Sequence, residues 1–339
     1  MKKSLAILTS IALLSSSVFA SDNIVPSPSP SNSQVTIQQA SADHLQQLVY
    51  TAQDKRQGDD IRADALRQLA RYPNQSSLVA VARALKDESA TIREAAVIGT
   101  DPYQFEHRWR IVAPLLQDSS SRVRVTATTS LIRDYSNMSS EQQQAIEPAY
   151  QELLTYLKSQ PDNDSVLLLA DVYRWHQQWD KAQTLYENLL VKTPNNVQVW
   201  LSVADNLRAQ GKDTEALNSL DKAIELQPQA ANLYYSKALT LVRLDKKAQA
   251  AAAIEKAAKL AEDNSYFWYL NGVLQEPVDI AKSVQSFEQA YLVSGAPEQL
   301  YAVCDIYVRT NNEKAEQCLA ELEKIAPAHV IEELKSKQG

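Results

Sequence analysis

The residues of this chain best suited to metal or haem chemistry are two cysteines and four histidines. The histidines are scattered along the chain, at His44, His107, His176 and His329. No two of them have the spacing that would put two metal ligands on one face of a helix. The sequence also has no Cys-x-x-Cys-His haem-attachment motif, no glycine-rich phosphate loop and no Gly-x-Ser-x-Gly motif. We therefore predict no catalytic site, no metal site, no cofactor and no enzyme activity.

The two cysteines, Cys304 and Cys318, fall on two consecutive helices expected within residues 296–329. Antiparallel packing of these helices could bring the thiols together, and a disulfide would suit an oxidising compartment. Counted back from the turn, however, Cys304 lies nearer opposite Ala315 than Cys318, and this would strain a bridge. The count favours two buried or free thiols, with a disulfide as the alternative.

A helical pattern with a fixed period must position these residues. An alanine is followed twelve residues later by a proline in three places, at Ala182 and Pro194, Ala216 and Pro228, and Ala315 and Pro327. The first two pairs are offset by 34 residues. Residues 163–196 and 197–230 both carry an apolar residue at the fourth place, small residues at the eighth and twentieth, and a large one at the twenty-fourth. This pattern resembles the tetratricopeptide repeat, which implies about five helix pairs over residues 163–329 and a capping helix over 330–339.

The resemblance also implies a partner-binding surface, because the family binds peptides against the concave positions of each first helix. In this chain, those positions include Asp171, Arg174, Trp175, Asp205, Arg208, Tyr235, Arg243, Tyr269 and Tyr307. Aspartate and arginine recur one repeat apart, so charges and aromatic rings would line a groove for an extended or helical peptide. The alternative is a solvated face on which each aspartate pairs with the arginine three residues later. The large residues at the fourth place, such as Trp200 and Trp268, are expected to pack between helices.

A second period, of 31 residues, runs through residues 41–136. Equivalent places hold Ile61-Arg62 with Ala65, Ile92-Arg93 with Ala96, and Val123-Arg124 with Ala127. Asp87 and Asp118 precede the second and third blocks and are expected to cap the second helix of each hairpin. These blocks resemble short HEAT-type repeats. A helical bridge over 137–162 is expected to join the two arrays, and it should start or kink near Pro148.

The N-terminus resembles an export signal. Lysines at positions 2 and 3, a short apolar run and Val18-Phe19-Ala20 are typical of a bacterial secretory signal peptide over residues 1–20. Residues 21–40 include Pro26-Ser27-Pro28-Ser29-Pro30-Ser31 and are expected to form a disordered linker. We therefore expect a periplasmic protein with no membrane insertion after signal cleavage. The net charge of −7 disfavours nucleic acid and anionic membranes as partners.

After the HEAT-like blocks, the chain carries the run Arg110-Ile111-Val112-Ala113-Pro114-Leu115-Leu116-Gln117-Asp118 with Val123-Arg124, then Tyr150 and the tetratricopeptide pattern. Over about residues 75–260, this order resembles the haem-free C-terminal half of certain bacterial periplasmic multihaem cytochromes. Those relatives carry haem through upstream Cys-x-x-Cys-His motifs, which this chain lacks.

We expect an all-α fold, an α-solenoid of short HEAT-like helix pairs followed by a tetratricopeptide superhelix. The predicted function is an exported interaction scaffold that binds a segment of another envelope protein in its groove, for example during assembly of a complex. The alternative is an accessory subunit of a periplasmic redox system that docks on a separate cytochrome.

Overall fold

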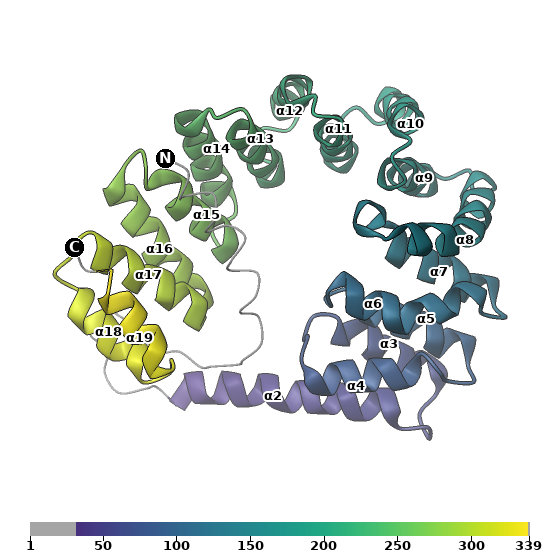
Figure 1. The fold of residues 1–339 in the computed structure, drawn as a ribbon, viewed down its shortest axis with the longest axis horizontal. Coiled ribbons are helices and arrows are strands. Elements are labelled where there is room, and N and C mark those ends of the chain that lie inside the picture. The colour runs from purple at the N-terminus through teal and green to yellow at the C-terminus, as the bar shows by residue number, and fades with distance from the viewer. Residues whose placement is uncertain (1–31, 338–339) are drawn as a thin grey trace. The chain divides into compact units, whose positions relative to one another are not determined.

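The computed structural model describes residues 32–337, and every regular element within them is a helix (Figure 1). This confirms the all-α prediction. The expected signal peptide, residues 1–20, lies outside the described residues. None of the helices in the described range is long and apolar enough to cross a membrane.

Two compact units make up the described chain. The N-terminal unit contains residues 36–228, and the C-terminal unit contains residues 229–337 together with residues 32–35. The first array comprises α2 (Asn32–Gln53), α3 (Asp59–Leu69), α4 (Gln75–Ala84), α5 (Ala90–Gly99), α6 (Phe105–Val112), the 3₁₀ turn η2 (Ala113–Gln117), α7 (Ser121–Ile132), η3 (Tyr135–Asn137) and the bridge α8 (Ser140–Lys158). The helix pairs that follow are α9 (Asn163–Trp175) with α10 (Trp179–Lys192), α11 (Val197–Ala209) with α12 (Asp213–Leu226), α13 (Ala231–Arg243) with α14 (Lys247–Leu260), α15 (Ser265–Gln275) with α16 (Ile280–Ser294), and α17 (Pro297–Arg309) with α18 (Ala315–Glu323), before α19 (Ala328–Lys335).

Helix α2 begins at Asn32, inside the segment expected to be a disordered linker. The prolines end at Pro30, and residues 32–42 contain neither proline nor glycine, so a helix can propagate through them. The linker prediction over residues 21–40 was therefore wrong for its last part. Residues 21–31 lie outside the described range.

Helices α3, α5 and α7 keep the 31-residue period, since they begin at Asp59, Ala90 and Ser121. Helix α5 packs against both α3 and α7. The alanines at equivalent places, Ala65, Ala96 and Ala127, are buried, which lets the helices approach closely.

An arginine near the start of each of these helices is paired with an acidic residue of the next block. The nitrogen to oxygen distances are 2.6 Å for Arg62 and Asp87, 2.7 Å for Arg93 and Asp118, and 2.6 Å for Arg124 and Glu152. Arg93 and Arg124 also donate to backbone carbonyls of the loop that precedes their own helix. These arginines thus hold successive blocks together, a role that the sequence did not reveal.

The expected capping role of Asp87 and Asp118 was wrong. Their Oδ1 atoms accept hydrogen bonds from the backbone N–H groups of Ser89 and Ser120, which precede the first turns of α5 and α7. A capping side chain accepts instead from the second or third helical residue. Both aspartates therefore shape the loop before the helix, and their other oxygens remain available to the arginines.

The bridge α8 begins at Ser140 and contains Pro148 in its interior. Of the two expected possibilities, a helix start or a kink near Pro148, the start was therefore wrong. Proline removes the hydrogen bond to the carbonyl of Gln144. Both residues are exposed, so water can bind that carbonyl. The opposite side of α8 is buried and packs against α7 and α9. At the α9 end, the His176 ring stacks on Tyr150 with 3.9 Å between ring centroids.

The 34-residue period is confirmed by the helix starts at Asn163, Val197, Ala231 and Ser265. The fifth pair begins at Pro297, one residue later than the sequence pattern placed it. The eighth residue of each first helix is small and buried, at Ala170, Ala204, Ala238, Gly272 and Cys304. A Cβ atom at Gly272 would meet the Phe287 ring at 2.8 Å, so the second helix lies directly against this position.

The turns inside four of the five helix pairs share one conformation, and the turn between α15 and α16 differs from them. Gln177, Gly211, Asp245 and Asn311 all have positive φ values, between 51° and 73°. In each case the next N–H donates to a carbonyl five residues earlier, which ends the first helix in a Schellman motif. The chain therefore reverses in the same way even where the residue is not glycine.

The turns between pairs also repeat, although the proline does not. Thr193, Gln227 and Ala261 have φ of −134° and ψ of 67° to 69°, and only the first two are followed by proline. The Trp200 and Trp268 indole N–H groups donate to the carbonyls of Pro194 and Glu262, at 2.8 and 2.9 Å. The tryptophan at the fourth place thus stabilises the turn before its helix by a hydrogen bond, and this turn forms with or without proline.

Candidate partner-binding surface

Asp171 and Arg174 lie on α9 and are paired with each other. The Arg174 Nη2 donates to Asp171 Oδ1 at 3.1 Å, and the Tyr186 hydroxyl from α10 donates to the same oxygen at 2.6 Å. Arg174 Nε also donates to the Tyr186 oxygen at 3.2 Å. The two charged side chains are only 14% and 17% exposed. This group is a closed contact between the helices of one pair.

Burial and the Asp171 charge together raise the pKa of Tyr186, so its hydroxyl remains a donor. Tyr186 is the large residue at the twenty-fourth place of its repeat, so the sequence pattern located it. Its hydrogen bonds to Asp171 and Arg174 were not expected, because the pattern assigned it only to the core.

Asp205 and Arg208 repeat this pairing on α11. The Asp205 side chain is 42% exposed, whereas that of Arg208 is 15% exposed. Asp205 is also among the groups that raise the pKa of Arg174, after Tyr186 and Asp171, and together they outweigh the lowering effect of burial. The predicted alternative, pairing within each helix, is therefore present for both pairs, and Asp205 is the member most open to a partner.

Trp175 lies between two guanidinium groups. The Cζ atoms of Arg133 and Arg174 are 5.6 and 5.5 Å from its ring centre, a distance at which cations attract an aromatic face. The Arg133 side chain is 46% exposed and contacts Asp101 at 3.7 Å. Arg133 follows α7 and lies outside the tetratricopeptide repeats, so tetratricopeptide positions could not identify it. In the N-terminal unit, Asp205 and Arg133 are thus exposed charged groups, and Trp175 is a partly exposed ring on α9, which contacts both α7 and α11.

In the C-terminal unit, Tyr235 and Tyr269 belong to a row of tyrosines that we call the tyrosine strip, defined as Tyr235, Tyr266, Tyr269 and Tyr301. Tyr235 and Tyr266 meet edge to face with 6.2 Å between centroids. Tyr269 and Tyr301 both pack against the buried cluster that contains Phe287 and Leu300. Burial and, to a smaller extent, Asp305, Tyr266 and Tyr301 raise the pKa of Tyr269. Tyr266 is 51% exposed and the other three are partly buried.

The strip follows the repeat. Tyr235, Tyr269 and Tyr301 are each the fifth residue of a first helix, counted from the starts of α13, α15 and α17. The sequence analysis missed Tyr301 because the predicted fifth repeat began one residue early.

Arg243, another predicted site residue, is exposed in the last turn of α13. Its counterpart Arg309 on α17 is bound to Glu276 and Asp305, at 2.5 and 2.7 Å.

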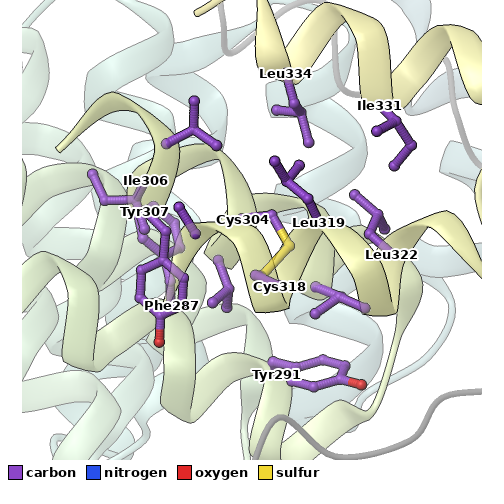
Figure 2. Close-up of a cluster of buried hydrophobic side chains, with 14 residues drawn as sticks. Phe287, Tyr291, Cys304, Ile306, Tyr307, Cys318, Leu319, Leu322, Ile331 and Leu334 are labelled. Atoms are coloured by element: carbon purple, nitrogen blue, oxygen red, sulfur yellow. A yellow bond between two sulfur atoms is a disulfide. The ribbon is translucent and has the colours of Figure 1, made fainter. Parts of the chain in front are cut away.

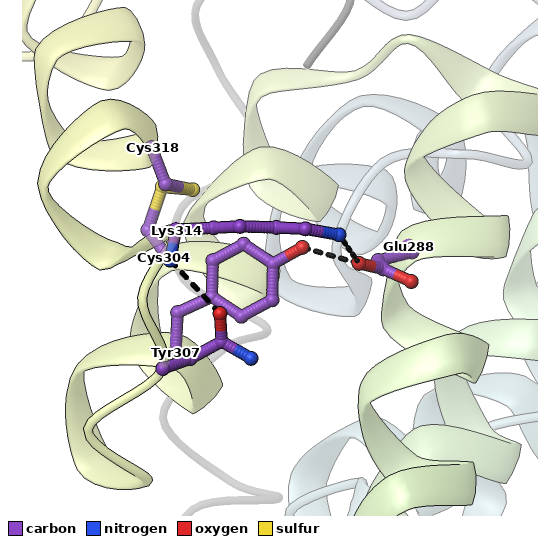
Figure 3. The surroundings of a disulfide bond; sticks show 6 residues. Glu288, Cys304, Tyr307, Lys314 and Cys318 are labelled. Atoms are coloured by element: carbon purple, nitrogen blue, oxygen red, sulfur yellow. Dashed lines mark hydrogen bonds and ion pairs between the residues drawn. A yellow bond between two sulfur atoms is a disulfide. The ribbon is translucent and has the colours of Figure 1, made fainter. Parts of the chain in front are cut away.

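Tyr307 does not lie on this surface. It is fully buried in the cluster that contains Phe287, Cys304 and Cys318 (Figure 2). Its hydroxyl donates to Glu288, which Lys314 also contacts at 3.0 Å (Figure 3). The prediction that Tyr307 contacts a partner was wrong, because the one-residue shift of α17 moves it to a core position.

Cys304 and Cys318 form a buried disulfide that links α17 to α18 (Figures 2 and 3). Their Cα atoms are 5.4 Å apart, within the usual range for a bridge. Asn311, the residue with positive φ in this turn, lies midway between them in the sequence. The expectation of two thiols was therefore wrong because it misplaced the turn, and no free cysteine remains in the described residues.

The described residues contain no group of three or more histidine, cysteine or acidic side chains placed to hold a metal ion.

Comparison with known proteins identifies the repeats. Residues 204–245 match a family described as TPR repeat, and residues 231–264 match one described as tetratricopeptide repeat. No curated protein matches the chain. This chain therefore contains tetratricopeptide repeats, and this fold suggests a protein interaction scaffold.

Among solved structures, MamA is 22% identical over 50% of this chain and 97% of its own, with a TM-score of 0.40. YrrB, described as a TPR protein with an unusual peptide-binding site, is 18% identical over 56% of this chain and 98% of its own, with a TM-score of 0.41. PilF from Pseudomonas aeruginosa is 17% identical over 64% of this chain and 99% of its own, with a TM-score of 0.41.

Proposed function

We propose that this protein is an exported, non-enzymatic scaffold that binds a segment of another cell-envelope protein on the first helices of its tetratricopeptide pairs. The observation that carries the proposal is the tetratricopeptide match over residues 204–264, next to polar side chains that remain accessible on α11 and at the end of α7. A carboxylate at Asp205 and a guanidinium at Arg133 can form charge-assisted hydrogen bonds with a partner peptide. The Trp175 ring offers an apolar contact of the kind that dominates binding energy.

The test is capture of partners from an envelope extract with the native chain and with an Asp205→Ala, Arg133→Ala variant. These two side chains are exposed, so their loss should leave the helices folded, unlike replacement of the enclosed Asp171 and Arg174. A matched control replaces Lys192 and Glu225, exposed charges on the second helices α10 and α12. We expect the control to retain a partner that the first variant loses. Capture of the same partners by the native chain, the variant and the control would show that this surface does not bind them.

Export to the periplasm is part of the proposal. Residues 1–20 resemble a signal peptide, and the disulfide between Cys304 and Cys318 supports an oxidising compartment. Cell fractionation and N-terminal sequencing of the purified protein test this. A chain that begins at Met1 in the cytoplasmic fraction would contradict it.

We also propose that residues 41–136 are short HEAT-like repeats. The 31-residue spacing of α3, α5 and α7 and the recurring arginine pairs support this. The alternative function, an accessory subunit of a periplasmic redox system, differs from the scaffold function only in the identity of the bound partner. Absorbance of haem in the captured material would favour that role, whereas a partner without haem would favour the general scaffold.

A further inference from the structure

The tyrosine strip has the chemistry of a surface that binds proline-rich peptides. Tyr235, Tyr266, Tyr269 and Tyr301 combine aromatic rings with phenolic hydroxyls on three successive first helices. A proline-rich peptide in the polyproline II conformation makes no internal hydrogen bonds, so its carbonyls are free to accept. Aromatic grooves with hydroxyl donors recognise such peptides.

The strip is continuous from one first helix to the next at its α13 end, where the Tyr235 ring meets the Tyr266 ring of α15 edge to face. One extended peptide can therefore contact rings of both helices. A polyproline II segment advances roughly 9 Å in each turn of three residues, so a short segment is long enough to reach more than one ring.

The charges at the α17 end of the strip favour an uncharged ligand. Lys337 contacts the Tyr301 hydroxyl at 3.1 Å and Asp305 at 3.0 Å. Arg309 contacts Asp305 at 2.7 Å. The charges at this end are thus paired with one another, and an acidic or basic peptide would have to displace these contacts there.

The chain itself contains a segment with this composition. Residues 24–31 read Ile-Val-Pro-Ser-Pro-Ser-Pro-Ser, carry no charge and directly precede α2. We propose that the tyrosine strip is a docking site for a proline-rich segment, and that its occupant is residues 24–31 of this same protein. The inference rests on the proposed function in taking first helices as peptide-binding surfaces. The self-docking inference adds that a partner that binds the tyrosine strip of the C-terminal unit must displace residues 24–31.

The test uses a fluorescent peptide of residues 22–31 and the whole chain with Pro26→Ala, Pro28→Ala and Pro30→Ala, which disables the chain's own copy. Fluorescence anisotropy should report binding to this variant that is about tenfold tighter than to the native chain, because a tethered copy competes at a high effective concentration. Equal affinity for both chains, or no binding to the proline variant, would overturn the proposal.

Side-chain replacements in the same proline variant locate the site. Tyr266→Ala removes the most exposed ring of the strip and should weaken peptide binding about tenfold, as expected for an aromatic anchor. Tyr269→Ala should weaken it further, with circular dichroism to verify folding. Tyr50→Ala, at a tyrosine 60% exposed in the N-terminal unit, is the matched control and should change nothing. Equal affinities for the Tyr266→Ala and Tyr50→Ala chains would overturn the assignment.

The proposed scaffold function and the self-docking inference are tested on different residues, so one can be refuted without the other. The capture experiment varies Asp205 and Arg133 in the N-terminal unit, whereas the peptide experiment varies the tyrosine strip. Loss of peptide binding with unchanged capture of a partner would refute only the self-docking segment.

Discussion

Arg93 and Asp118 form a bidentate salt bridge between consecutive blocks of the N-terminal unit. The Nε and Nη2 atoms of Arg93 each donate to a different oxygen of Asp118, both at 2.7 Å. The side chains are 12% and 6% exposed, so water does not replace the contact readily. Parallel hydrogen bonds of this kind fix the orientation of both partners.

Replacement of either partner should therefore destabilise the N-terminal unit. We expect Arg93→Ala or Asp118→Ala to lower the free energy of unfolding by about 2–3 kcal/mol, since each leaves a poorly solvated charge without its partner. Urea unfolding followed by circular dichroism measures this. Arg83→Ala is the control, because Arg83 is exposed, its guanidinium contacts the neutral side chain of Gln53, and its loss should cost less than about 1 kcal/mol. Similar losses for Arg93 and Arg83 would contradict the role of the contact.

The same contact predicts loss of stability in acid. Hydrogen bonds from Arg93 lower the pKa of Asp118 below its usual value of 3.8. A carboxyl whose pKa is lowered by folding contributes stability above its unfolded pKa and loses it as the pH falls through the folded pKa. The urea midpoint should therefore fall as the pH drops below about 4. Asp118→Asn should show a smaller fall over this range, and an equal fall would argue against this carboxyl as a cause.

Turn conformation predicts opposite effects at two equivalent positions. Asp245 and Gly211 both have positive φ, and a Cβ at Gly211 would meet nothing within 4 Å, so crowding does not complicate the comparison. Asp245→Gly should stabilise the fold by up to about 1 kcal/mol, and Gly211→Asp should destabilise it by about the same amount. Thermal unfolding measures both shifts, and changes of the same sign would contradict the argument.

The disulfide should stabilise the end of the C-terminal unit. Cys304 and Cys318 close a loop with a sequence separation of 14. By the chain-entropy estimate, a loop of this length contributes about 3 kcal/mol. The Cys304→Ser, Cys318→Ser chain should therefore unfold at a lower urea concentration. Alkylation of denatured, unreduced protein should modify no cysteine, and two modified cysteines would show that the bridge is absent.

The repeat periods predicted most of the helices, because small residues at Ala170, Ala204 and Ala238 recur wherever helices must approach closely. The fifth repeat was displaced by one residue because the connection from α16 to α17 is shorter than the connections between the earlier pairs. That shift misplaced both Tyr307 and the two cysteines. Pairing of Arg93 with Asp118 joins residues 25 positions apart, and a sequence period cannot distinguish such a contact from a helix cap. The sequence analysis missed two site residues. Arg133 lies outside the tetratricopeptide repeats, and Tyr301 lies in the displaced fifth repeat.

The central claim, that first helices of the tetratricopeptide pairs bind another envelope protein, is tested most directly by cross-linking in cells. A photoreactive side chain can replace Ala209, exposed at the end of α11, or Val191, which is 85% exposed on the second helix α10. We predict a cross-linked partner from position 209 and none from position 191. Cross-links of equal yield from both positions, or none from position 209, would contradict the claim.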